Sequence, residues 1–285
     1  MIPFARMLEY GNVVEQRIVG NIALDNTITL PISTAQYSTA STDQYWFIGG
    51  PTLRRYTFST GTWDEITGRI GANSTRIADG VGMCCAGNRL YVFGGGSTAN
   101  TNTVLASAFD MDSGTWVQLA DIPVGTYNAR LVYDGMDKIY MQRYRTLYVY
   151  TISTNTWNQL ASPDVGPTSS SSGLAGFAYC AGALYLIHNG GMRKYNISTN
   201  TWSACSPPPV NYLACWLCTY NTKDIFCTFG NTGAGFWKYD TELDSYTQMS
   251  STMPLRSNVS STTLISGTTR NYVLATSVST VYRIT

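Results

Sequence analysis

The sequence predicts an all-β protein: a six-bladed propeller in which each blade is a sheet of four antiparallel strands. Three observations lead to this prediction. A Thr-Trp step and its variants recur at intervals of 53, 41, 45 and 44 residues, which is the length of a four-stranded blade. Short runs rich in β-branched and aromatic residues recur with the same spacing. No window of the chain shows the periodicity of an amphipathic helix.

The recurring step marks a hairpin. It is found at Thr62-Trp63, Thr115-Trp116, Thr156-Trp157, Thr201-Trp202 and, more weakly, Ser245-Tyr246. An aromatic residue lies seven positions before each second residue of the step: Tyr56, Phe109, Tyr150, Tyr195 and Tyr239. Two positions before it comes Gly61, Gly114, Asn155, Asn200 or Asp244. These residue types best tolerate the left-handed backbone of a short turn, so each copy should contain strand, tight turn and strand.

A second set of strands precedes these hairpins. Six runs have strand composition: residues 45–50, 90–95, 139–142, 184–187, 225–230 and 272–276. Each follows another β-rich run across a short turn, which brings the count to four strands in each copy. We number the strands of a copy first to fourth in chain order.

The sixth copy lacks its last strand. Its aromatic residue is Tyr282, and the sequence stops at Thr285 before a hairpin partner is reached. We expect a strand within residues 13–22 to pair with the strand ending at Thr285 and to close the ring, because closure removes exposed sheet edges. This reading divides the chain into an N-terminal arm, residues 1–12, and a single propeller, residues 13–285.

The repeat resembles the kelch motif. The doublets Gly49-Gly50 and Gly94-Gly95, each followed by an aromatic residue (Tyr56 or Phe109) and then by Trp seven residues later, carry the resemblance, and residues 195–202 are especially close to the pattern. The chain departs from it where Arg143-Tyr144 replaces the glycine pair. Kelch propellers include protein-binding adaptors, copper radical oxidases, sialic acid mutarotases and parts of larger assemblies, so the resemblance implies a fold without choosing a function.

Composition narrows the choice of partners. Charged residues make up only 12% of the chain, and the net charge of +1 supplies no long-range field, so we expect no nucleic acid partner. No apolar stretch approaches the roughly 18 residues of a membrane helix, and the N-terminus has no apolar leader core. We therefore expect no membrane insertion. The seven cysteines are odd in number and irregularly spaced, which favours free thiols in a reducing compartment.

The sequence offers no catalytic or metal-binding set. Its single histidine, His188, excludes the ligand set of a copper oxidase and a Ser-His-Asp triad. Cys215 and Cys218 form a C-x-x-C, but within a strand residues three apart point to opposite faces. A turn centred on residues 222 and 223 would make Cys218 and Cys227 cross-strand neighbours. We expect no catalytic residue, no metal and no cofactor.

The candidate binding residues are mostly arginines. Arg54, Arg55, Arg143, Arg145 and Arg193 are placed at the start of the third strand of blades 1, 3 and 4, with Tyr144 between two of them. Equivalent positions in neighbouring blades lie on the same face, and arginine forks suit carboxylates, sialic acids or phosphates. Two long connections, residues 96–103 and 162–173, are expected on that face. The alternative is a set of ordinary surface arginines balanced by nearby acids.

These observations favour a non-enzymatic module that binds a protein or a glycan within a larger assembly. The low charge, the Thr-, Ser- and Asn-rich surface and the opening segment, residues 6–12, suggest a virion component of a tailed bacteriophage, made in the host cytoplasm. Two alternatives stay open. One is a sugar-binding enzyme resembling the sialic acid mutarotases, and the other is a cytoplasmic protein-binding adaptor.

Overall fold

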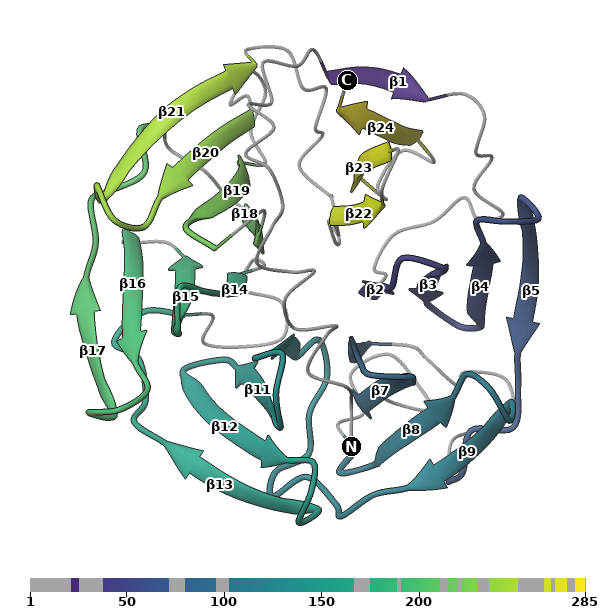
Figure 1. The fold of residues 1–285 in the computed structure, drawn as a ribbon. Coiled ribbons are helices and arrows are strands. Elements are labelled where there is room, and N and C mark those ends of the chain that lie inside the picture. Colours follow the sequence, from purple (N-terminus) through teal and green to yellow (C-terminus); the bar gives the residue numbers. More distant parts are fainter. Residues whose placement is uncertain are drawn as a thin grey trace.

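The computed structural model describes part of the chain. The described residues are 22–25, 38–71, 80–95, 103–166, 175–188, 191–210, 215–219, 222–229, 236–250, 264–267, 270–275 and 280–284. The predicted arm, residues 1–12, lies outside them. The described strands form four-stranded antiparallel sheets arranged around a common centre (Figure 1).

Five of these sheets are built from four consecutive strands each. Blade 1 contains β2 (Ser38–Ser41), β3 (Tyr45–Gly49), β4 (Leu53–Thr57) and β5 (Thr62–Ile66). Blade 2 contains β6 (Val81–Ala86), β7 (Arg89–Gly94), β8 (Ala106–Asp110) and β9 (Thr115–Gln118). Blade 3 contains β10 (Arg130–Tyr133), β11 (Lys138–Arg143), β12 (Thr146–Thr151) and β13 (Thr156–Leu160). Blade 4 contains β14 (Gly176–Cys180), β15 (Ala183–His188), β16 (Gly191–Asn196) and β17 (Thr201–Ala204). Blade 5 contains β18 (Cys215–Thr219), β19 (Asp224–Phe229), β20 (Phe236–Asp240) and β21 (Ser245–Ser250).

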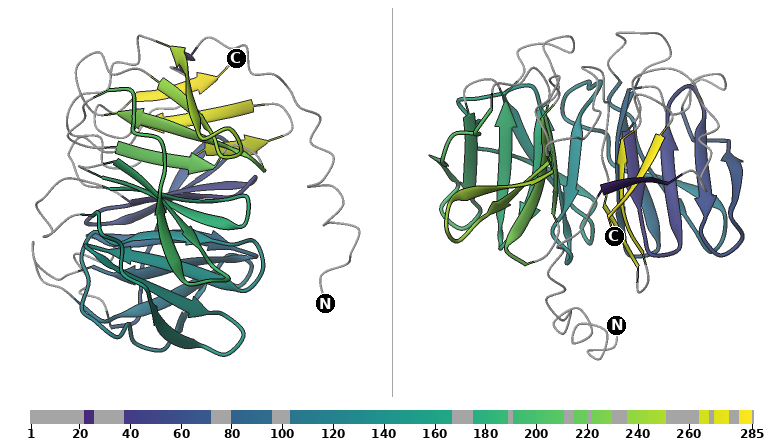
Figure 2. Two further views of the ribbon diagram at one scale, coloured as in Figure 1. Left: turned by 90° about the vertical axis from the view of Figure 1, so that its left-hand side faces the viewer. Right: turned by 90° about the horizontal axis from the view of Figure 1, so that it is seen from above.

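The expected count of six packed blades is corrected to five. The innermost strands of neighbouring blades contact one another at four successive junctions, β2 with β6, β6 with β10, β10 with β14 and β14 with β18. The remaining sheet has the order β1-β24-β23-β22. Among the described residues, β22 makes no comparable packing contact with β18 or with β2. Figure 2 shows the blades standing side by side, with their strands running along the axis.

The closing strand expected within residues 13–22 is also corrected. Residues 13–21 lie outside the described part of the chain. The N-terminal strand that the structure describes is β1 (Ile22–Asp25), which pairs antiparallel with β24 (Thr280–Ile284), Ile22 opposite Ile284. The other strands of that sheet are β22 (Leu264–Gly267) and β23 (Arg270–Ala275). The strand was predicted too early in the chain because a hydrophobic pattern alone fixes strand bounds poorly when no turn signal flanks it.

The predicted hairpins are confirmed in all five blades. The aromatic residue of the third strand lies opposite the Trp or Tyr of the fourth, and the ring centroids are 4.9–5.3 Å apart. The turn residues that we expected to be left-handed have φ values of 48–69°: Gly61, Gly114, Asn155, Asn200 and Asp244. The residue types of the repeat are therefore explained by backbone geometry and ring packing together.

The turn residue and the Trp of one blade also hold the preceding blade. In blade 4, Asn200 Oδ1 accepts a hydrogen bond from the Tyr195 hydroxyl (2.6 Å) and another from the backbone N–H of Ala161 (2.8 Å). Trp202 Nε1 donates to the carbonyl of the same Ala161 at 2.7 Å. We call the two hydrogen bonds to Ala161, one from its N–H to Asn200 and one from Trp202 to its carbonyl, the inter-blade clamp. Blade 3 holds blade 2 in the same way: Asn155 and Trp157 bind the N–H and carbonyl of Ala120 at 2.8 and 3.0 Å.

The clamp varies at the two outer junctions. Blade 2 has Gly114 at the turn, and only the Trp116 indole bond, to the Thr67 carbonyl at 2.7 Å, is formed. Blade 5 has Asp244, whose carboxylate accepts from Ser206 N at 2.8 Å and from the Tyr239 hydroxyl at 2.6 Å. Partial burial raises the pKa of Asp244, but the hydrogen bonds from Tyr239 and Ser206 and the nearby charge of Lys194 together outweigh it, and the net pKa lies below its ordinary value.

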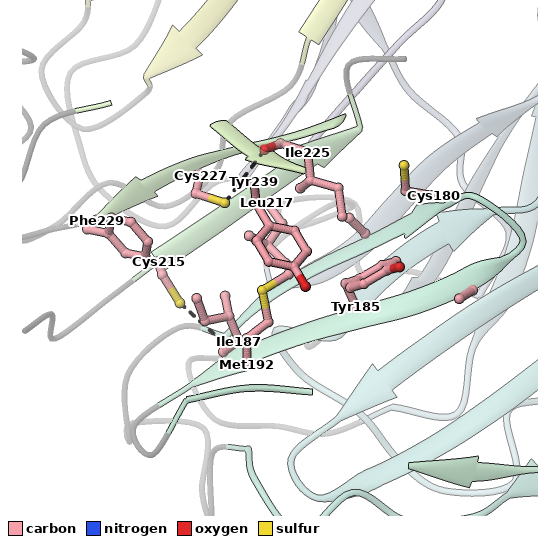
Figure 3. Packing of buried hydrophobic residues seen from close by; sticks show 12 residues of the cluster. Cys180, Tyr185, Ile187, Met192, Cys215, Leu217, Ile225, Cys227, Phe229 and Tyr239 are labelled. Carbon is pink, nitrogen blue, oxygen red and sulfur yellow. Dashed lines mark hydrogen bonds between the residues drawn. The ribbon is translucent and has the colours of Figure 1, made fainter. Parts of the chain in front are cut away.

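The core between blades 4 and 5 corrects a register prediction. β18 and β19 place Cys227 opposite Leu217 and Cys218 opposite Phe226, so Cys218 and Cys227 are not cross-strand partners. The pairing is centred on residue 222 rather than between residues 222 and 223, and this shift of one residue in register changes which side chains lie opposite each other. Cys215 and Cys227 are buried in this core, and the Cys215 thiol donates to the Ile187 carbonyl at 3.2 Å (Figure 3).

The clamp predicts a graded loss of stability at Asn200. Asn200→Ala removes two hydrogen bonds and leaves a β-carbon in a left-handed conformation, so we expect a loss of about 2–3 kcal/mol in the free energy of unfolding. Asn200→Gly removes the same bonds but keeps the conformation, and we expect a loss of about 1 kcal/mol. Urea unfolding measures both values. A variant Asn200→Ala as stable as the wild type would contradict the clamp.

Asp244 makes one clamp dependent on pH. Because the folded-state pKa is lowered, its contribution to stability is complete above the unfolded-state value of about 4 and is lost as pH falls through the folded-state value. The side-chain amide oxygen of an Asp244→Asn variant would accept the same two hydrogen bonds at every pH. We therefore expect the stabilities of wild type and Asp244→Asn to converge, or to change order, as pH falls from 6 to 3. Parallel curves of urea midpoint against pH would show that the carboxylate has no such role.

Candidate functional site

The structure places the six predicted binding residues in two separate regions. Arg54 and Arg55 are in β4 of blade 1, and Arg193 is in β16 of blade 4, both third strands as expected. The expectation is wrong for the residues of blade 3. Arg143 ends the second strand, β11, and Tyr144 and Arg145 form the turn that follows it.

The arginines of blade 1 are engaged within their own blade. Arg55 binds both carboxylate oxygens of Asp64, at 3.1 and 2.9 Å, and its guanidinium lies 5.0 Å from the centroid of the Tyr45 ring. Arg54 donates to the hydroxyl of Thr52 at 3.3 Å. Blade 2 separates Arg54 and Arg55 from the arginines of blades 3 and 4. The alternative of a surface arginine balanced by a nearby acid fits Arg55.

The turn of blade 3, residues 143–145, holds an aromatic residue in a left-handed conformation. Tyr144 has a φ of 52°, a conformation that strains a bulky side chain. The guanidinium of Arg143 lies over the Tyr144 ring, 4.3 Å from its centroid. The side-chain amide of Gln142 donates to the Tyr144 carbonyl, and the Thr146 hydroxyl donates to the Arg143 carbonyl at 2.6 Å. These contacts hold the strained turn in one conformation. We call residues 143–145 the Arg-Tyr-Arg turn.

The connection from blade 3 to blade 4 passes directly beside this turn. Arg145 Nε donates to the Gly166 carbonyl at 3.5 Å. A β-carbon at Gly166 would lie 2.6 Å from the Tyr144 carbonyl oxygen, so only glycine permits this approach. Arg193 binds both oxygens of Asp164 at 2.8 Å from two of its nitrogens. The Arg193 hydrogen bond lowers the pKa of Asp164, and the same pairing raises the pKa of Arg193.

In blade 2, the connection between the second and third strands also lies beside the connection to the next blade. Thr103, after the second strand, forms an isolated bridge with Thr126, which lies between blades 2 and 3. Gly95 N donates to the Thr126 carbonyl at 3.0 Å. Of the two long connections that we expected here, residues 96–102 and 167–174 lie outside the described residues.

The Arg-Tyr-Arg turn has unused hydrogen-bonding capacity. Arg143 Nε is buried and has no hydrogen-bond partner. Arg145 is exposed, and its described hydrogen bond is the long one to Gly166. Two guanidinium groups beside an aromatic ring can donate hydrogen bonds to an anionic or strongly polar group, which is the chemistry that the sequence indicated for this position.

Sequence reasoning missed one buried arginine, Arg69, and one partly buried arginine, Arg130. Arg69, in the connection from blade 1 to blade 2, is 5% exposed. It donates to the Ser107 hydroxyl (2.9 Å) and to the carbonyls of Val92 and Gly94 (3.1 Å each). Burial lowers the pKa of Arg69 to about 9 and that of Arg130, in β10, to about 10. Nothing in the sequence marks either arginine as removed from solvent, because burial of a charged side chain depends on its neighbours in space.

The described residues contain no group of three or more His, Cys, Asp or Glu side chains that could hold a metal ion. His188 ends β15 and is 7% exposed. Within the same residues, no helix has the length and apolar character needed to cross a membrane.

A comparison with known families agrees with this architecture. Residues 79–123 match the Kelch motif. The matched segment contains all four strands of blade 2, including the hairpin of Phe109 and Trp116. Together with the five packed blades, the match supports a kelch-repeat β-propeller.

Arg69 predicts a large effect from a single buried charge. Arg69→Met keeps much of the side-chain volume but leaves the Ser107 hydroxyl and several carbonyls without their donor. We expect the free energy of unfolding to fall by about 2–4 kcal/mol. Arg89→Met is the matched control, since Arg89 is 43% exposed and its ion pair with Asp110 is long, at 3.4 Å. The control should lose less than about 1 kcal/mol in urea unfolding, and equal losses would refute the role of Arg69.

Proposed function

We propose that this chain is a non-enzymatic protein-binding propeller whose partner meets the face carrying the Arg-Tyr-Arg turn. The observation that carries the proposal is the left-handed backbone of Tyr144, with a φ of 52°. Such a conformation costs a bulky L-residue about 1–2 kcal/mol. Strain of this kind persists where the surrounding structure enforces it, and it is concentrated at functional positions.

Blades 2 and 4 place glycine at the corresponding connection, where a left-handed backbone causes no strain. Blade 2 has Gly94 and Gly95 there, with φ of 71° and 91°, and blade 4 has Gly191, with φ of 119°. A glycine at residue 144 would relieve the strain without any change of backbone. The presence of Tyr, held between Arg143 and Arg145, is therefore better explained by contact with a partner than by folding.

The residue types of the turn also favour a protein partner. Tyr and Arg are the residues that most often dominate the energy of protein interfaces, because they bring large contact areas together with hydrogen bonds. A turn on a rigid propeller presents them in a fixed arrangement, which reduces the entropy lost on binding. The sequence-based expectations of a virion attachment role, and of a sugar-binding enzyme as the alternative, rest on composition and resemblance and remain predictions.

The test places a photo-crosslinking amino acid at position 144 of the full chain, in a lysate of the source cells. We expect a discrete protein adduct at this position. The matched control carries the same amino acid at Met136, a residue 74% exposed in the turn between β10 and β11. An adduct at 144 that is absent at 136 and is competed by unlabelled wild-type chain supports the proposal. The same adducts at both positions, or none at 144, would reject it.

A further inference from the structure

We propose that the face opposite the Arg-Tyr-Arg turn is a second docking surface, on which Leu243 and Met136 contact apolar side chains of a polypeptide partner and neighbouring carboxylates contact its lysines or arginines. Strand β11 runs between the two faces, from the turn at residues 134–137 to the Arg-Tyr-Arg turn. We call the face that carries the turns between first and second strands and between third and fourth strands the distal face. The inference goes beyond the proposed function, which concerns the other face.

The two most exposed large apolar side chains of the described chain both lie on the distal face. Leu243, in the turn between β20 and β21, and Met136, in the turn between β10 and β11, are each 74% exposed. The next large apolar side chain, Ile70, is 44% exposed. Because single apolar residues are common on protein surfaces, the argument for an anchor comes from the equivalent positions of the other blades.

The other blades place a hydroxyl group where blade 5 has Leu243. The equivalent residues each form a hydrogen bond of 2.7–2.8 Å with the hydroxyl of the threonine two positions later: Thr60, Ser113, Thr154 and Thr199. Blade 5 keeps a hydroxyl at the later position, in Ser245, but leucine cannot bond to it. Leu243 therefore lacks a hydrogen bond that the fold offers and exposes an apolar side chain instead. Contact with a partner explains this exchange better than folding does.

Both anchors project from turns whose backbone is held by hydrogen bonds. In blade 5, Asp240 Oδ1 accepts a hydrogen bond from the N–H of Leu243 at 2.9 Å. In blade 3, Asp134 Oδ1 accepts from the N–H of Met136 at 2.8 Å, and the Tyr133 hydroxyl donates to the Met136 carbonyl at 2.8 Å. A side chain presented by a fixed backbone loses less conformational entropy when a partner binds.

The charge around the anchors favours a basic partner. In the described turns of the distal face, the basic residue is Lys223 and the acidic residues are Asp43, Asp112, Asp134, Asp137, Glu242 and Asp244. The described connections of the opposite face are balanced, with Arg69 and Arg145 against Asp121 and Asp164. Lysine or arginine side chains beside the apolar groups of a partner would complement the distal face.

The direct readout is the methyl signals of Leu243 and Met136 in the full chain labelled with 13C-methyl leucine and methionine, assigned with Leu243→Thr and Met136→Ser. The probe is the peptide acetyl-Lys-Leu-Gly-Leu-Lys-amide. One control peptide replaces both Lys by Glu, and the other replaces both Leu by Ser. We expect saturable shifts of both methyl signals with the probe and none with either control. Unmoved signals with the probe, or equal shifts with either control, would overturn the inference.

Glu242→Gln isolates the contribution of charge. Glu242 is exposed, and its carboxylate accepts no hydrogen bond from the described residues, so the substitution should leave the turn intact. We expect the dissociation constant of the probe read at the Leu243 methyl to rise about threefold. The value read at the Met136 methyl, two blades away, should not change and serves as the control in the same sample. An unchanged value at Leu243 would contradict the role of the carboxylate.

Leu243→Thr separates binding from folding. The new hydroxyl can bond to Ser245 as in the other blades, so we expect the melting temperature to rise by about 1–2 °C. The matched variant Thr199→Leu should lower the melting temperature by a similar amount. Its leucine methyl signal should not shift with the probe, because the flanking residues, Ser198 and Asn200, are uncharged. A Leu243→Thr variant less stable than the wild type would show that Leu243 serves folding and would reject it as an anchor.

Discussion

The propeller depends on one repeated interaction, the inter-blade clamp. At the middle junctions, a single residue beyond the outer strand of one blade has both its N–H and its carbonyl bound by the next blade, as Ala161 is bound by Asn200 and Trp202. The turn that supplies the acceptor must be left-handed, which restricts its residue type. The indole must pack on the aromatic ring of the third strand, which fixes its register. The same few residues therefore determine the turn conformation, the packing of the aromatic rings and the contact between neighbouring blades.

This rigid frame explains how the strained Arg-Tyr-Arg turn can be retained. The inner strands of blades 3 and 4 pack against each other, and the connection between these blades lies against the Arg-Tyr-Arg turn at Gly166. Tyr144 is contacted by Gln142 and Arg143 of its own blade, and Gly166 of the connection lies close to its carbonyl oxygen. A similar turn on an isolated hairpin would relax, because nothing would oppose the roughly 1–2 kcal/mol gained by leaving the left-handed region.

The sequence predicted those features that depend on residues close together in the chain. The hairpins, the left-handed turn positions and the second strands were predicted correctly because aromatic spacing and turn chemistry are local. The number of packed blades, the bounds of β1 and the register of Cys218 were wrong, since they depend on packing between distant segments. In the site, the chemistry of Arg143 and Arg145 was visible in the sequence. The separation of Arg55 from them was not, because its partner Asp64 could be paired with it only through the fold.

The direction of the clamp has a consequence for synthesis on the ribosome. Each bond runs from a later blade back to an earlier one: Ala161 waits for Asn200, 39 residues downstream, and for Trp202, 41 residues downstream. A nascent chain that has just completed blade 3 therefore exposes two backbone groups to water until the hairpin of blade 4 emerges. Water satisfies them in the meantime, so the wait is tolerable. During synthesis, each blade can therefore be bound by the next one as soon as the next hairpin has left the ribosome.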